Sequence, residues 1–478
     1  MGTEDSHNEN HYAGVGGATT PQAKEQVPVA PRGDKSSDAV EANTPASAGR
    51  SRFTSIARRV ARTELLTGAT LLALENRAIP IVSVRASLRA GSYFEPRDKP
   101  GLARLTAEML ERGTGRRTKL QIAGELEAVG AELEFSADTF AVQVSGRTLS
   151  KDLPRFIETL AEILREPSFP ADELQKLKQQ TVALIQEQQA NTRFRAYEKL
   201  THIIFDPANP FFVPPGEQLV NSINSITVED AREYYQQRYG GRSLILAVSG
   251  DVEASDVQTR FADAFGNFAG PENVDVNISD PAPQSEARRE IVVLKEKASV
   301  DVMLGCAAPL RRDASDYYAA LLANSALGES TLSSRLGLEV RDREGLTYGI
   351  GSRFRAPGLA AGPWYVAVTV NPRNVERAIE SATNVLSGYV ENGIRPDELA
   401  DEKSSAIGSF KVALSTNTGI AEALWNAEFY SLGADYLDRF PQLVQAVTVE
   451  EANTAIRKYF RPECLTAVIA GDYHAVGK

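Results

Sequence analysis

The sequence contains an internal repeat. The segment Thr227-Val-Glu-Asp-Ala231 recurs as Thr448-Val-Glu-Glu-Ala452, 221 positions later, and the offset then holds without a gap. Each copy ends in a Gly-Asp pair, at Gly250-Asp251 and at Gly471-Asp472. Both copies have the pattern of a helix, a short break, a buried strand and a turn. A fixed offset between similar segments is typical of a duplicated structural unit. We therefore expect two homologous lobes.

Strand and helix patterns predict the fold class. Residues 71–74 are a short apolar run, and the segment from Pro80 alternates apolar and polar side chains as a half-buried strand does. Helical patterns begin at Leu102 and cover residues 153–164 and 171–189. Strands that can pair antiparallel, with helices grouped between them, favour an α+β fold over a parallel βαβ sheet. Each lobe is thus expected to be a largely antiparallel sheet backed by helices.

Composition divides the chain into four parts. Residues 1–52 are rich in small, polar and charged side chains and have almost nothing to bury, so we expect a disordered tail or a linker to another domain. Residues 53–269 and 291–478 would be the N-terminal and C-terminal domains. Residues 270–290 are polar and contain proline, as an interdomain linker does. The length of 478 residues also favours two domains over a single core.

Bulk composition excludes several functional classes. The net charge is -11 and no basic run occurs, so no nucleic-acid partner is expected. No apolar stretch reaches the roughly 18 residues of a membrane span. The N-terminus lacks the charged and apolar regions of a secretory signal. This predicts a cytoplasmic protein, or a periplasmic one if the natural N-terminus differs. Cys306 and Cys464 lie in apolar runs and are expected to be buried thiols.

The segment from Gly91 to Thr114 resembles the start of a pitrilysin/insulinase-type peptidase domain. In that family a helix carries the motif HxxEH, whose two histidines bind zinc and whose glutamate activates the bound water. In this chain the three motif positions hold Arg104, Ala107 and Glu108. A guanidinium cannot ligate zinc, so the resemblance implies a degenerate motif. Arg104 and Glu108 would instead form an i,i+4 ion pair on the exposed side of the helix. The positions that keep the family frame are Gly101, Leu102, Ala103, Met109, Leu110, Gly113 and Thr114.

No other residues replace the lost ligands. His7 and His11 lie in the polar tail, and His202 and His474 have no ligand partner in sequence. The third zinc ligand of the family is a glutamate on a later helix, for which Glu187 is the one relic we identify. One carboxylate without imidazoles cannot hold catalytic zinc. We expect no metal and no other cofactor in this chain.

The segment from Ser333 to Tyr348 resembles the second-domain signature of the same family. In that signature an arginine and a tyrosine reach across to the zinc-bearing domain and hydrogen-bond the substrate backbone beside the scissile bond. The matching residues here are Arg341 and Tyr348. A fixed cation and a phenol aimed at a carbonyl stabilise the negative charge that develops in acyl transfer. Alternatively, Tyr348 only fills a strand and Arg341 pairs with a neighbouring carboxylate, from Glu339, Asp342 or Glu344.

The resemblance implies a division of labour between two chains. In some bacterial and organellar members of the family, one chain carries HxxEH and the other lacks it but supplies the Arg/Tyr pair. This chain looks like the second type, a substrate-binding subunit or C-terminal half of a zinc-dependent endopeptidase that is inactive alone. Its partner, an HxxEH-bearing subunit or fused half, would hold the zinc, and its ligands would be peptides or unfolded proteins. The alternative is a proteolytically inert scaffold subunit of the same fold. An independently active zinc peptidase would need histidines that the chain lacks.

Overall fold

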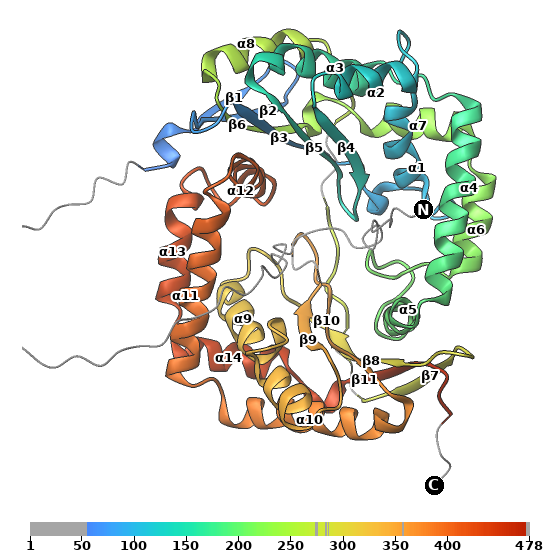
Figure 1. Ribbon diagram of the computed structural model, residues 1–478, viewed down its shortest axis with the longest axis vertical. Coiled ribbons are helices and arrows are strands. Elements are labelled where there is room, and N and C mark those ends of the chain that lie inside the picture. Colours follow the sequence, from blue (N-terminus) through green and yellow to red (C-terminus); the bar gives the residue numbers. More distant parts are fainter. Residues whose placement is uncertain (1–54, 273–275, 283, 285, 356–357, 475–478) are drawn as a thin grey trace, which may run out of the picture.

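The computed structural model describes residues 55–474, apart from residues 273–275, 283, 285 and 356–357. The predicted tail, residues 1–52, lies outside the described residues. The chain forms two lobes that face each other, each built on one sheet (Figure 1). No helix in the described ranges combines the length and the apolar character needed to cross a lipid bilayer.

The first lobe is built on a six-stranded sheet with the order β1-β2-β6-β3-β5-β4. Its neighbouring strands pair antiparallel, except β2 and β6, which are parallel. The strands are β1 (Ala61–Glu64), β2 (Thr70–Glu75), β3 (Ile81–Leu88), β4 (Glu132–Ala137), β5 (Val142–Leu149) and β6 (Ile245–Gly250).

The second lobe repeats this sheet without a counterpart of β1. Its order is β7-β11-β8-β10-β9, and again one pair, β7 and β11, is parallel while the others are antiparallel. The strands are β7 (Arg289–Val293), β8 (Val300–Ala307), β9 (Ile350–Phe354), β10 (Pro363–Val370) and β11 (Thr466–Gly471). Apart from β1, each strand of the first sheet has a counterpart in the second, which confirms the predicted pair of largely antiparallel α+β lobes.

Helices cover the outer face of each sheet (Figure 1). In the first lobe they are α1 (Leu102–Met109), α2 (Lys119–Glu127), α3 (Leu153–Arg165), α4 (Ala171–Ala190), α6 (Gly216–Ser225), α7 (Val228–Arg238) and α8 (Ala254–Phe265). In the second lobe they are α9 (Tyr317–Asn324), α10 (Val375–Asn392), α11 (Pro396–Ala413), α13 (Tyr436–Ala446) and α14 (Val449–Tyr459).

The repeated threonines start equivalent helices. The Thr227 hydroxyl accepts the backbone N–H of Asp230 at the start of α7, and the Thr448 hydroxyl accepts that of Glu451 at the start of α14, both over 3.1 Å. Each acidic side chain bonds back to the threonine N–H, which completes a capping box. The sequence repeat therefore encodes two copies of one local structure.

The two lobes exchange one helix each, which the sequence did not predict. Helix α5 (Thr192–Ile204) follows α4 in the chain but lies against β8 and β11 of the second sheet. Helix α12 (Asn417–Phe429) follows α11 but lies against β3 and β6 of the first sheet (Figure 1). Apolar side chains of both helices and both sheets share one core between the lobes. The domain boundaries drawn at residues 53, 270 and 291 remain a prediction, since each sheet is covered partly by a helix of the other half.

Candidate functional site

The degenerate zinc motif lies on α1. The predicted ion pair forms, with Arg104 Nε donating to Glu108 Oε1 over 2.7 Å. Its predicted exposed position is wrong, because the two side chains are only 13% and 27% exposed. The reason is that α4, α7 and β4 all lie against α1. Ala107 is fully buried together with Leu105.

These residues do not fit a zinc ion. At the three motif positions α1 presents a guanidinium, a methyl group and a carboxylate that is already bonded to the guanidinium. Glu187 is exposed on α4. Within the described part of the chain, no group of three His, Cys, Asp or Glu side chains could hold a metal ion. The absence of metal from this chain stays a prediction, and these side chains give it a physical reason.

The two histidines that the structure describes, His202 and His474, do not lie in a cluster of possible metal ligands. His202 Nε2 lies 2.6 Å from the carbonyl oxygen of Val213, and its ring stacks on Phe212 at 4.6 Å. His474 is exposed, with Nε2 3.9 Å from Asp472 Oδ1. His7 and His11 lie outside the described residues.

A second carboxylate beside α1 has an altered acidity. Burial raises the pKa of Glu111 to about 7, and the negative charges of Glu134 and Glu108 act in the same direction, while Arg112 opposes them. An acid with this pKa changes charge near neutral pH. The first lobe therefore has a carboxylate next to the degenerate motif, Glu111, that changes charge near neutral pH.

In the second lobe, the predicted Arg/Tyr segment begins with a structural arginine. Arg335 donates to both oxygens of Glu398 on α11, at 3.0 and 2.5 Å, and to the carbonyl of Gly393 at 3.0 Å. Gly337 passes so close to the loop before it that a Cβ there would lie 2.2 Å from the carbonyl oxygen of Thr331. These contacts attach the start of the segment to the lobe.

Arg341 lies on the π-helical stretch η7 (Gly337–Arg343). Such stretches are rare and often occur at functional sites. The turn after η7 is also fixed, since Glu344 accepts hydrogen bonds from Ser381 and Arg377 at 2.6 and 2.9 Å. These bonds, the one from Ser381 first, lower the pKa of Glu344. Thr347 Oγ1 donates to the carbonyl of Thr369 at 2.6 Å.

The structure brings Arg341 and Tyr348 together. Arg341 Nε donates to the main-chain oxygen of Tyr348 over 3.2 Å, and Nη1 bonds to Asp342. The third nitrogen, Nη2, has no hydrogen-bond partner among the described residues. The Tyr348 side chain is 98% exposed, so it fills no core. The arrangement can present one guanidinium nitrogen and one phenol to a ligand from a fixed backbone.

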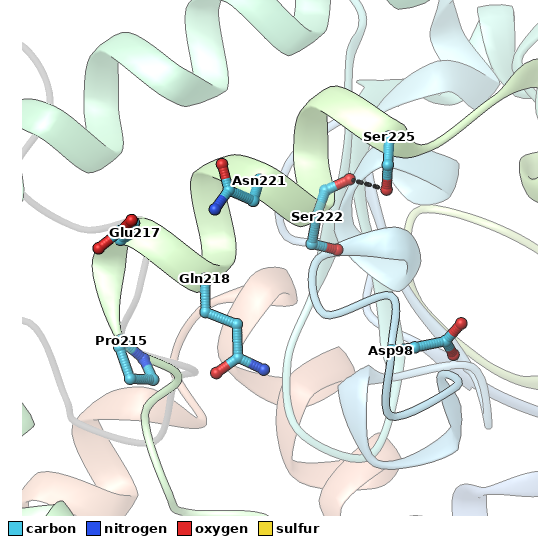
Figure 2. A pocket seen from close by; sticks show the side chains of 7 residues that line it. All are labelled: Asp98, Pro215, Glu217, Gln218, Asn221, Ser222 and Ser225. Atoms are coloured by element: carbon cyan, nitrogen blue, oxygen red, sulfur yellow. Dashed lines mark hydrogen bonds between the residues drawn. The ribbon is translucent and has the colours of Figure 1, made fainter.

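A polar cleft of about 540 Å³ lies elsewhere, beside α6 (Figure 2). Among its lining residues, Ser225 Oγ donates to the carbonyl of Ser222 at 2.8 Å (Figure 2). None of the candidate residues lines this cleft, so we assign it no part in the site. The lining residues are Asp98, Pro215, Glu217, Gln218, Asn221, Ser222 and Ser225.

The supports of the Arg/Tyr site were not predicted. Glu398, Arg377 and Thr369 come from α11, α10 and β10, and nothing in their local sequence marks them. Only the packing of these elements on one another identifies them.

Comparisons with known proteins identify the family. Residues 71–209 match the insulinase family, peptidase family M16, and residues 225–406 match the peptidase M16 inactive domain. The non-peptidase homolog YmxG of Helicobacter pylori is 22% identical over 402 residues, which are 83% of this chain and 90% of that protein. An uncharacterized zinc protease of Streptomyces coelicolor is 24% identical over 356 residues, 71% of this chain and 75% of that protein. The mitochondrial-processing peptidase subunit beta of Rattus norvegicus is 27% identical over 183 residues, 38% of this chain and 37% of that protein.

Solved structures share the fold. The peptidase M16 inactive domain from Pseudomonas fluorescens superposes with a TM-score of 0.80 at 28% identity, covering 88% of this chain and 99% of that one. A protease from Helicobacter pylori gives a TM-score of 0.76 at 17% identity, covering 86% and 98%. The periplasmic protease PqqL from Escherichia coli gives 0.71 at 14% identity, covering 87% of this chain and 46% of that one. The chain therefore belongs to peptidase family M16, the pitrilysin/insulinase-type family.

Proposed function

We propose that this chain is the non-catalytic, substrate-binding subunit, or half, of a zinc-dependent endopeptidase of the M16 type. The zinc would belong to a partner that carries an intact HxxEH motif, and the ligands would be peptides or unfolded proteins. One observation carries the proposal: Arg341 is fixed on the main chain of Tyr348 while both side chains still reach solvent. The residues at the motif positions of α1 support the non-catalytic part of the proposal.

The geometry suits a peptide carbonyl as ligand. The bonds to Tyr348 and Asp342 hold the Arg341 side chain in one orientation, so little side-chain freedom is lost on binding. Nη2 can then donate to a carbonyl oxygen that becomes negative during cleavage. The Tyr348 hydroxyl, on a neighbouring exposed side chain, can donate a second bond. A group fixed in this way stabilises charge without having to reorganise.

The test uses the full chain assembled with a zinc-bearing M16 partner. Arg341→Ala should lower kcat by about 10²–10³-fold, the usual cost of losing one preorganised donor. Arg341→Lys should restore only part of this loss, because a point charge lacks the planar fork of the guanidinium. Tyr348→Phe removes the hydroxyl and keeps the ring, so a lower kcat in this variant would assign the contribution of Tyr348 to its hydroxyl. Arg343→Ala is the matched control, since Arg343 lies on the same stretch, is 75% exposed and pairs with Glu339.

The second candidate function is a proteolytically inert scaffold of the same fold. It is supported by the resemblance to a protein named as a non-peptidase homolog. A scaffold predicts wild-type turnover in the Arg341 and Tyr348 variants, and no zinc-bearing M16 chain among the copurifying proteins. Wild-type kcat in both Arg341 variants, with normal assembly, would rule out the substrate-binding role.

A further inference from the structure

Thr369, near the end of β10, joins the candidate site to a helix of the other half of the chain. Its hydroxyl accepts a hydrogen bond from Arg193 Nη2 at 2.8 Å. Its carbonyl accepts the bond from Thr347 Oγ1, the residue before Tyr348. Arg193 belongs to α5, the helix that crosses from the first lobe to the second sheet. The helix exchange therefore places an arginine of the first half beside the Arg341–Tyr348 site.

A buried carboxylate fixes Arg193. The Asp301 side chain on β8 is only 8% exposed, and its Oδ1 accepts Arg193 Nε at 3.1 Å and the Thr369 hydroxyl at 2.6 Å. Its Oδ2 accepts the Thr192 hydroxyl at 2.6 Å. Charge-assisted bonds of this kind hold one edge of a guanidinium in a defined orientation. Arg193 thus has a fixed inner edge.

The outer edge of Arg193 faces solvent. The side chain is 53% exposed, and its Nη1 nitrogen has no hydrogen-bond partner within the described part of the chain. An arginine that served only to attach α5 to the sheet would not need this open edge. A guanidinium with an open, oriented edge is suited to a carboxylate, which can accept two of its hydrogen bonds.

We infer that Arg193 is a second ligand-binding arginine of this site and that it selects an acidic side chain in the bound peptide. The inference rests on the proposed function. Arg341 would bind the peptide main chain, and Arg193 would bind a carboxylate of a neighbouring residue. The site is then composite, because α5 from the first half of the chain completes the surface that Arg341 on η7 and Tyr348 after it begin.

The experiment measures peptide affinity of the full chain by fluorescence anisotropy. The probes are two sets of fluorescein-labelled, unstructured peptides of about 15 residues. An extended peptide covers roughly 3.3 Å per residue, so this length is chosen to reach both arginines. One set carries a single Glu at each position in turn, and the other carries Gln at the same positions. Wild-type protein should bind its best Glu peptide roughly tenfold more tightly than the matched Gln peptide, as expected for one charge-assisted hydrogen bond.

The variants separate this role from a structural one. Arg193→Ala should abolish the preference for Glu over Gln while leaving affinity for the Gln peptide nearly unchanged. Arg193→Gln, which can keep a bond to Asp301 or Thr369, should do the same without loosening α5. Arg341→Ala should weaken binding of both peptides equally. Arg373→Ala removes an exposed arginine just after β10 and is the control for net charge, so its preference should match wild type.

Each contrary result has a distinct meaning. If Arg341→Ala weakens binding but both Arg193 variants keep the Glu preference, the inference is wrong and the proposed function stands. The inference is equally wrong if the Arg193 variants lower the thermal midpoint and weaken both peptides alike, since Arg193 is then only an attachment of α5. If the wild-type chain binds no peptide of either set, the proposed function falls, and the inference falls with it.

Discussion

Arg104 and Glu108 lie one turn apart on α1, and the arginine Nε donates to the glutamate Oε1 over 2.7 Å. They occupy the two positions at which an active M16 helix carries its zinc-binding histidines. The pair is mostly shielded from solvent, so the two charges interact with each other more than with water. The motif positions therefore hold an ion pair of their own, in addition to lacking the family's ligands.

This pair predicts that the chain binds no stoichiometric zinc and cleaves no peptide alone. Three motif ligands or catalytic groups are absent, and a guanidinium carries its positive charge at all relevant pH values. Protein purified without metal and then incubated with zinc should contain no bound zinc by elemental analysis. One tightly bound zinc per chain, with peptidase activity that a chelator abolishes, would contradict this prediction.

Restoring the motif should not restore the site. In the variant Arg104→His/Ala107→Glu/Glu108→His, the new glutamate would replace a side chain that is fully buried. Burying an unpaired carboxylate costs several kcal/mol, so we expect the free energy of unfolding to fall by about 3 kcal/mol or more. Arg104→His/Glu108→His without the change at residue 107 is the matched control. A triple variant as stable as wild type would show that α1 can accommodate the family glutamate.

Glu111 should make stability depend on pH near neutrality. Its pKa in the folded protein is about 7, above the ordinary value of 4.5. The folded state therefore binds this proton more tightly, so the contribution of Glu111 to stability is full below about pH 4.5 and declines as pH rises to about 7. Glu111→Gln should remove this decline, and its advantage over wild type should grow between about pH 4.5 and 7 and then level off.

The measurement is urea unfolding of both proteins at several pH values across this window. Glu127→Gln on α2 is the control, because Glu127 is exposed. A difference between Glu111→Gln and wild type that does not change with pH would show that Glu111 has an ordinary acidity.

Much of the fold could be predicted because each copy of the repeat carries signals that depend only on neighbouring residues. Thr227 and Thr448 each cap a helix through an acidic residue three positions later, and a capping box needs nothing beyond one turn of chain. The strand alternation after Pro80 is local in the same sense, and β3 forms there. Two homologous lobes were thus predictable without any tertiary information.

The helix exchange and the composition of the site were not predictable in this way. The sequence of α5 shows an apolar face but does not show which sheet that face will cover. Arg193, Asp301 and Thr369 meet only because α5 crosses to the second sheet. Arg341 and Tyr348 were identified by resemblance, whereas the bond between them and the exposure of Tyr348 come from the structure.

The two repeated glycines should respond unequally to the same substitution. Gly250 and Gly471 have φ values of 157° and 149°, which residues other than glycine rarely adopt. A Cβ at Gly250 would lie 2.3 Å from the carbonyl oxygen of Ile81, whereas one at Gly471 would lie 2.9 Å from a Val300 methyl group. The nearest backbone atom to the added Cβ is thus 2.3 Å away at Gly250 and 3.0 Å away at Gly471, where it is the Ser299 carbonyl oxygen, so the backbone beside Gly250 must shift further. We expect Gly250→Ala to cost about 2–4 kcal/mol and Gly471→Ala about 1–3 kcal/mol. Equal losses in urea unfolding would show that the two turns relax alike.

The exchange of α5 and α12 predicts that the two lobes unfold together. Trp425 on α12 is 3% exposed against the first sheet, and its Nε1 donates to Ser87 Oγ on β3 at 2.7 Å. Since each lobe holds a helix of the other half, unfolding one removes part of the core of the other. Wild-type protein should therefore show a single urea transition, with tryptophan fluorescence and far-ultraviolet circular dichroism changing together.

Variants of Trp425 test whether this contact carries the coupling. Trp425→Ala should lower the free energy of unfolding by about 3–5 kcal/mol, as expected for a large buried aromatic side chain. Trp425→Phe keeps most of the packing but leaves the Ser87 hydroxyl without its donor, so it should cost about 1–3 kcal/mol. Trp364→Phe is the matched control, because Trp364 is fully buried in the core of the second lobe and donates to Asn324 within it. That control should destabilise the protein without separating the lobes, whereas Trp425→Ala should broaden the transition or split it in two. A wild-type protein that already unfolds in two separate steps would show that the exchanged helices do not couple the lobes.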